Sequence, residues 1–207
     1  MSALAAWRTR LAYQPLSLGA VALVTSAALV VANDMTGPLI AAAEERDLQA
    51  SLLQVLPANH ADNELLKDAV TLPGPDGAPL TVYRSRHEGR VNGAIFRTTA
   101  RGYAGDIAVL IGIDAGGTLL GARVLRHQET PGLGDKIEAA KSPWIHAFAG
   151  KSLGAPPAER WAVKKDGGEF DQFAGATITP RAVVNAIKGG LEFYAANRQR
   201  ILEGETQ

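Results

Sequence analysis

The longest uninterrupted run of hydrophobic positions lies near the start of the chain. Residues 11–33 contain no Asp, Glu, Lys or Arg, and their apolar core extends from Leu16 to Ala32. A helix over this core would rise about 26 Å, which approaches the roughly 30 Å hydrocarbon thickness of a bilayer. The pattern predicts one N-terminal transmembrane helix over residues 11–33.

A cleaved signal peptide is the competing interpretation of the same segment. Arg8 and Arg10 precede the apolar run, and residues 30–32 are small enough for a signal peptidase site. The apolar core is longer than the roughly 7 to 15 residues usual in signal peptides, so the sequence favours an uncleaved anchor.

Charges on the two sides of the segment predict its orientation. Arg8 and Arg10 lie before it, whereas three carboxylates follow it before the first basic residue, Arg46: Asp34, Glu44 and Glu45. Positive charge stays on the cytoplasmic side. We therefore expect residues 1–10 in the cytoplasm and, in a bacterium, the body of the protein in the periplasm, attached to the inner membrane.

A helical linker region is expected over residues 34–72. Proline is favoured at the first position of a helix, so Gly37-Pro38 predicts a helix start. Apolar residues then recur at helical spacing, and Pro57 ends the pattern. The stretch LPGPDGAP, residues 72–79, is typical of a turn-rich loop.

The remaining chain, residues 73–207, alternates strand-like and helical patterns. Runs rich in Val, Ile, Leu and Thr predict strands at 80–85, 91–100, 106–114 and 118–127, and at 161–165. Short helices are expected near 135–141 and 142–148, and a long final helix from Pro180 into the 190s, with close packing or a bend at Gly189-Gly190. The expected fold class is α+β, with an antiparallel or mixed sheet and flanking helices after the N-terminal transmembrane helix.

Composition narrows the function. The 207 residues carry 21 basic and 21 acidic side chains, and no basic stripe suggests nucleic acid as a partner. The absence of cysteine excludes disulfides, thiolate metal sites and covalent c-type haem. The four histidines lack metal-ligand spacing and are interpreted as ordinary satisfied or surface residues. Electron transfer, if present, requires an organic cofactor.

The sequence DQFAGATITPRAVVNAI, residues 171–187, carries the clearest candidate chemistry. Thr179-Pro180 predicts a helix start, so amide groups and the positive end of the helix dipole would face an anion just upstream. Gly175 and Ala176 leave the Thr177 hydroxyl sterically open. Asp171 is close enough in sequence to orient a donor or an attacking hydroxyl. A capped turn without further function explains the same residues.

The pattern Asp171-x-x-Ala174-Gly175-Ala176-Thr177-x-Thr179 resembles the flavinylation motif of proteins that receive flavin mononucleotide (FMN) from a flavin transferase that uses FAD. The resemblance implies a phosphoester between FMN and Thr177. Ala174 departs from the motif, because many members carry serine or threonine there.

Two further segments are similar to parts of the same family. HQETPGLGDKI, residues 127–137, resembles its flavin-facing loop, which implies that Glu129, Thr130, Gly132, Leu133 and Gly134 border the cofactor. GYAGDIAVLIGID, residues 102–114, is similar to the turn and strand that precede this loop, and Tyr103 could stack on a ring.

The order of the three motifs behind one N-terminal anchor resembles the G subunit of the Rnf ion-translocating electron transport complex. The C subunit of the sodium-translocating NADH:quinone reductase is similar but typically longer before the flavin loop. The resemblance implies a membrane-anchored redox subunit, without independent turnover, that carries covalent FMN and works with other membrane subunits of the complex. A non-redox membrane-tethered scaffold and a reversible flavin- or ligand-binding domain are the alternatives.

Overall fold

The computed structural model describes residues 13–203. Arg8, Arg10 and the first two residues of the predicted transmembrane segment lie outside this range. The chain divides into two compact units, one ending at Leu48 and the other beginning at Gln49. The second unit contains the sheet, the final helix and every candidate site residue, and is called the body below.

Helix α2, Tyr13–Gln54, is a single element of 42 residues. It is the one helix of the described chain that is long and apolar enough to cross a membrane. The predicted helix start at Gly37-Pro38 is wrong, because Pro38 lies inside α2. Proline removes one backbone hydrogen bond from a helix interior, but the Ala-, Leu- and Glu-rich sequence that follows Pro38 favours helix.

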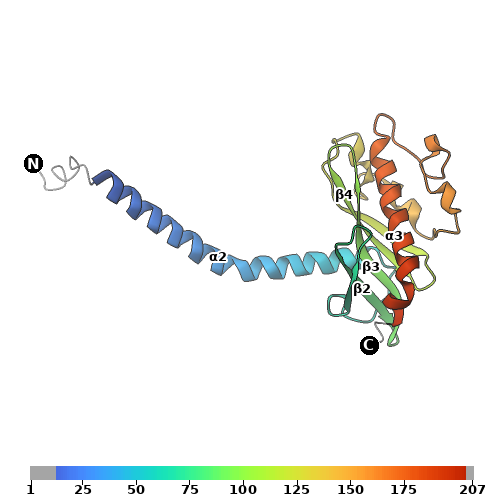
Figure 1. Cartoon of the computed structure of the whole chain (residues 1–207), viewed down its shortest axis with the longest axis horizontal. Coiled ribbons are helices and arrows are strands. Elements are labelled where there is room, and N and C mark those ends of the chain that lie inside the picture. Colours follow the sequence, from blue (N-terminus) through green and yellow to red (C-terminus); the bar gives the residue numbers. More distant parts are fainter. Residues whose placement is uncertain (1–12, 204–207) are drawn as a thin grey trace, which may run out of the picture. The chain divides into compact units, whose positions relative to one another are not determined.

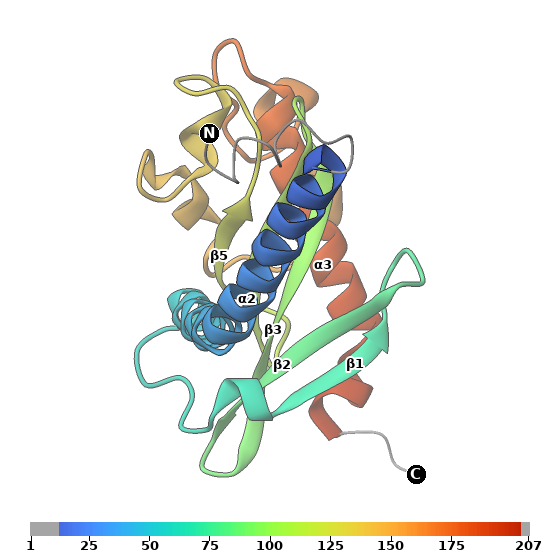
Figure 2. The same ribbon diagram turned by 90° about the vertical axis from the view of Figure 1, so that its left-hand side faces the viewer.

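The body is built on a five-stranded sheet in which every strand pairs antiparallel with its neighbour in sequence. Figure 2 shows these strands with α3 behind them. The α+β prediction is confirmed, and the sheet is antiparallel rather than mixed. The strands are β1 (Ala69–Pro73), β2 (Pro79–His87), β3 (Arg90–Arg101), β4 (Asp106–Asp114) and β5 (Leu119–Arg126).

Strand β1 was not expected from the sequence. It forms a hairpin with β2 in which Leu72 lies opposite Leu80, and the predicted loop supplies the turn. Leu72 is buried, as are Leu52 and Leu65 earlier in the chain. The body therefore begins well before residue 73, where the sequence suggested its boundary.

Helix α3, Ile178–Glu203, covers one face of the sheet, which Figure 1 shows as the red helix along β3 and β4. Its apolar side contributes Val183, Ile187 and Leu191 to the main core. Gly190 permits the close approach: a Cβ there would collide with Ile111 and would lie 2.7 Å from Cγ2 of Thr98.

The opposite face of the sheet is covered at one point by the chain that follows α2. Val55 is buried and lies against Gly112 of β4 and Gly121 of β5, where a Cβ would lie 2.6 and 2.9 Å from its carbonyl oxygen. Leu52 is buried beside it in sequence. Val55 is thereby packed against the sheet within the body.

The segment between β5 and α3 forms short 3-10 helices instead of longer elements. The helices predicted near 135–141 and 142–148 appear as η2 (Gly134–Ile137) and η3 (Pro143–Phe148). The strand predicted at 161–165 is wrong: the chain makes a single bridge between Val163 and Phe170 and then forms η5 (Lys164–Asp166). The remaining 3-10 helices are η1 (Leu65–Lys67) and η4 (Ala158–Arg160).

Aromatic packing explains why residues 161–163 lie outside the sheet. Trp161 and Phe170 are buried with Phe148, and the Phe148 and Phe170 rings stack with centroids 4.4 Å apart. This cluster holds the loop before α3 in place.

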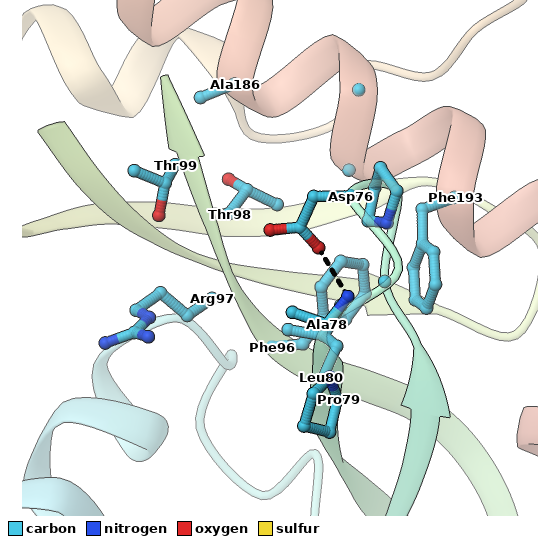
Figure 3. Close-up of a pocket in the computed structure, with 14 residues that line it drawn as sticks. Asp76, Ala78, Pro79, Leu80, Phe96, Arg97, Thr98, Thr99, Ala186 and Phe193 are labelled. Atoms are coloured by element: carbon cyan, nitrogen blue, oxygen red, sulfur yellow. Dashed lines mark hydrogen bonds between the residues drawn. The ribbon is translucent and has the colours of Figure 1, made fainter. Parts of the chain in front are cut away.

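A cavity of about 310 Å³ lies between the β1–β2 turn, β3 and α3 (Figure 3). Phe96 and Phe193 lie on it, and the Asp76 carboxylate closes the turn by accepting a hydrogen bond from the Ala78 amide. Gly189 also borders the cavity, and nothing lies within 4 Å of the place where its Cβ would be.

The adjacent glycines of α3 should therefore respond oppositely to alanine. We expect Gly189→Ala to stabilise the protein by about 1 kcal/mol, because alanine favours a helix and its methyl group meets open space. We expect Gly190→Ala to destabilise it by about 1–3 kcal/mol through overpacking against β3 and β4. Urea unfolding of both variants tests this; equal effects would contradict the described packing.

Candidate functional site

Most of the predicted site residues line a second cavity of about 280 Å³, where the turn before β4, the loop after β5 and the start of α3 meet. Segments more than forty residues apart in sequence contribute to it. Its lining comprises Tyr103, Glu129, Thr130, Leu133, Gly134, Gly175, Ala176, Thr177, Ile178 and Thr179.

The loop after β5 is held by its own backbone. The amides of Leu133 and Gly134 both donate to the Thr130 carbonyl, at 3.2 and 3.0 Å, and Gly132 takes a positive φ of 78° to complete the turn. Gly132 itself is not part of the cavity lining. Its contribution is the backbone conformation that directs Thr130 and Leu133 to the cavity.

The Glu129 side chain joins all three segments. One carboxylate oxygen accepts a hydrogen bond from the Ala104 amide at 3.0 Å, and the other accepts one from the Thr179 hydroxyl. Glu129 is 4% exposed. Gly134 leaves the room for this contact, because a Cβ there would lie 2.8 Å from Oγ1 of Thr179 and 2.9 Å from Cβ of Glu129.

Helix α3 begins at Ile178, two residues before the predicted start at Pro180, so Thr177 takes the capping position. The Thr177 carbonyl accepts the first helical hydrogen bond, from the Arg181 amide at 3.3 Å. Thr179 is instead inside the first turn and its hydroxyl is occupied by Glu129. Thr177 thus directly precedes the helix, whereas the contact with Glu129 keeps the Thr179 side chain inside the first turn.

The Thr177 hydroxyl is available for chemistry. No hydrogen bond to it is found within residues 13–203, and the side chain is partly exposed on the cavity. Gly175 has a φ of 80° and Ala176 is small, so the chain turns sharply without covering Thr177. Thr177 and Thr179 thus differ in kind: the first is open, and the second is 1% exposed.

Asp171 lies outside the cavity lining. Its carboxylate pairs with Lys164 at 2.6 Å, and its carbonyl accepts a hydrogen bond from the Trp144 indole at 2.9 Å. The side chain is 69% exposed. Proximity in sequence to Thr177 therefore does not place Asp171 inside the cavity.

Large apolar side chains lie open around the cavity. Tyr103, Leu133 and Ile178 are 69, 45 and 45% exposed, although each belongs to the lining. Ile178 was missed in the sequence, where it stands between the two threonines. An apolar residue between the two hydroxyl residues of a capping motif is the sequence signal that could have identified it.

Ion pairs brace the loop behind the cavity. Lys141 donates to Glu138 at 2.8 Å and to Asp135 at 2.9 Å, and these hydrogen bonds lower the pKa of both carboxyl groups and raise the pKa of Lys141. Because the two acids titrate below their ordinary range, this stabilisation is present at neutral pH and is lost as the pH falls through their lowered pKa values.

His127 joins this network to Glu129. Its Nε2 lies 2.9 Å from the Glu138 carboxylate, and its Nδ1 accepts a hydrogen bond from the Glu129 amide at 3.1 Å. This pattern fits a neutral imidazole protonated at Nε2. Within the described residues, no group of three His, Asp or Glu side chains could hold a metal ion.

The cavity therefore combines an open hydroxyl, a helix N-terminus, a buried carboxylate and an apolar rim, which together suit a ligand with a phosphate and a flat ring. Residues 102–192 match the family model of the FMN-binding domain, which spans all the segments that form this cavity. The class is thus a protein with an FMN-binding domain.

Two relatives define the family more closely. The G subunit of the ion-translocating oxidoreductase complex of Stutzerimonas stutzeri is 48% identical over 189 residues, which cover 91% of this chain and 83% of that protein. Its counterpart in Cereibacter sphaeroides (strain ATCC 17029 / ATH 2.4.9) is 48% identical over 196 residues, which cover 95% and 90%. The chain belongs to this family of Rnf G subunits, as the sequence motifs predicted.

The solved structure of NqrC from Shewanella oneidensis matches part of this chain. It has a TM-score of 0.49 and 21% sequence identity, and the match covers 70% of this chain and 72% of that one. Family membership makes the protein a redox subunit of an oxidoreductase complex with an electron-transfer role. Its apolar helix α2 is long enough to serve as a membrane anchor.

The two threonines of the site should differ in their effects on folding. In protein without flavin, we expect Thr179→Val to destabilise by about 1–3 kcal/mol, because Glu129 loses a donor in a buried place. Thr177→Val, the matched control, should change stability by less than about 0.5 kcal/mol, because its hydroxyl has no partner to lose. Thermal unfolding measures both. A destabilised Thr177→Val would contradict the assigned contacts.

Proposed function

We propose that this protein carries one FMN covalently bound through a phosphoester to Thr177, and that it passes electrons between membrane partners on the periplasmic side. The open Thr177 hydroxyl on the cavity is the observation that carries the proposal. Bound flavin supplies the redox chemistry, whereas the chain holds and orients it.

Thr177 is the hydroxyl best suited to attachment. Thr179 is buried and donates to Glu129, so it is neither accessible nor free to react. Thr130 borders the same cavity, but it lies in the loop after β5 and not directly before α3. Thr177 alone of the three combines exposure on the cavity with a position directly before a helix.

The start of α3 suits the phosphate. The Ile178 and Thr179 amides belong to the first turn, where no carbonyl precedes them at helical spacing, and Arg181 makes the first helical bond. Together with the helix dipole these groups favour a negative charge beside Thr177. The Arg181 side chain forms an ion pair with Asp166 at 2.7 Å, which fixes the preceding loop to the helix.

The apolar rim suits the ring system. Tyr103, Leu133 and Ile178 come from the three segments that meet at the cavity, and their exposed surfaces could be covered by an isoalloxazine ring. Glu129, Thr130 and the backbone at Gly134 form the inner wall. A covalent bond retains the flavin irrespective of its free concentration, which matters outside the cytoplasm.

Attachment requires a flavin transferase that uses FAD. In the balanced reaction, the Thr177 oxygen bonds to the phosphorus on the FMN side, the pyrophosphate bond breaks, AMP leaves, and the hydroxyl proton is released. Asp171, exposed and six residues from Thr177, is available to such an enzyme from outside the cavity. Its predicted role in orienting the reacting groups would then be exercised in the complex with the transferase.

The anchor and its partners complete the proposal. Arg8 and Arg10 before the apolar helix and the acidic residues after it support a cytoplasmic N-terminus and a periplasmic body. The other membrane subunits of the Rnf-type complex are the expected electron donors and acceptors.

Coexpression with a flavin transferase tests the attachment site. We expect the full chain to retain fluorescence after complete denaturation, and intact-mass measurement to show one added FMN. Thr177→Val should lose both signals, because the ester oxygen is gone, whereas Thr177→Ser should retain them.

Thr130→Val is the matched control, because it removes another hydroxyl from the same cavity and should leave the covalent flavin in place. Denaturation-resistant flavin on Thr177→Val would refute the assignment. Flavin that is released from the wild-type chain on unfolding would instead support reversible binding.

A further inference from the structure

We infer that the Glu129 carboxylate acts as a fixed negative charge that sets the reduction potential of the flavin, keeping it lower than the same cavity would without that charge. The inference rests on the proposed function, because it places the flavin in this cavity. Glu129 is thereby a tuning residue and not a phosphate ligand or an attachment site.

The hydrogen bonds of Glu129 suit an ionised carboxylate. Ala104 donates an amide N–H to one carboxylate oxygen and Thr179 donates a hydroxyl to the other. An ionised carboxylate accepts at both oxygens, and each oxygen of Glu129 has a donor here. The side chain is 4% exposed, so water screens this charge little.

Among the described residues, Glu129 has no cationic partner. Within the described chain, Glu129 forms no ion pair with any Lys, Arg or His, whereas its neighbours Asp135 and Glu138 share the Lys141 ammonium. Glu129 is therefore the carboxylate of this region whose field is not cancelled by a partner, and it is the one that lines the cavity.

The packing fixes the position of the charge. A Cβ at Gly102 would collide with one carboxylate oxygen of Glu129, and a Cβ at Gly134 would lie 3.2 Å from the other. Two glycines thus enclose the carboxylate from both sides. A charge confined in this way acts on the cavity from a constant position, as an electrostatic tuning group requires.

The direction of the effect follows from Coulomb's law. Reduction adds negative charge to the flavin, and a carboxylate in the wall of the same poorly screened cavity opposes that addition. Removing the charge while retaining the shape should make reduction easier. Glutamine does this, because its oxygen can accept from Ala104 and its amide can donate to the Thr179 oxygen.

Spectroelectrochemical titration of the flavinylated full chain tests the inference. We expect Glu129→Gln to shift the midpoint potential to a more positive value. Glu192→Gln, the matched control, removes the same charge from an exposed position on α3, about 20 Å along the helix from Ile178, and should leave the potential unchanged.

Thr179→Val separates charge from packing, because it disturbs the same contact and retains the carboxylate. The inference is overturned if Glu129→Gln carries flavin at the wild-type potential, or if Thr179→Val raises the potential as much. It is also overturned if Glu129→Gln, made with the transferase, carries no flavin, since Glu129 would then serve attachment. A wild-type chain without flavin on Thr177 would instead refute the proposed function itself.

Discussion

The contact between Glu129 and Thr179 holds the site together, because it connects the loop after β5 to the first turn of α3 across fifty residues of sequence. The Ala104 amide adds the turn before β4 to the same carboxylate. Burying a carboxylate is unfavourable unless donors surround it, so these three segments stabilise one another through a single side chain. The cavity is the space left between them.

The same arrangement gives different roles to two threonines that are equivalent in the sequence motif. Thr179 is used internally, which leaves Thr177 at the capping position with an open hydroxyl. Which threonine of the motif keeps a free hydroxyl thus depends on Glu129, which lies fifty residues earlier in the sequence. The apolar rim and the helix terminus add what a flat ring and a phosphate need.

Much of the fold was predictable because it follows from local patterning. Runs rich in Val, Ile, Leu and Thr indicated four of the five strands, and the apolar stripe of α3 indicated the final helix. Pro38 gave a wrong prediction of a helix start, because the helix continues through the proline. Trp161 and Val163 resembled a strand, but aromatic packing with Phe170 holds them elsewhere. The motifs identified most of the cavity, whereas Ile178 and the position of Asp171 required tertiary structure.

The strand order of the sheet determines when the cavity can form during folding. All five strands pair with sequence neighbours and precede α3, so the meander can assemble while the chain is still being synthesised. Thr177 arrives last, together with the helix that completes the core. Under the proposed function, a transferase that recognises the assembled cavity would modify only chains that have finished folding, and a chain truncated before α3 would remain unmodified.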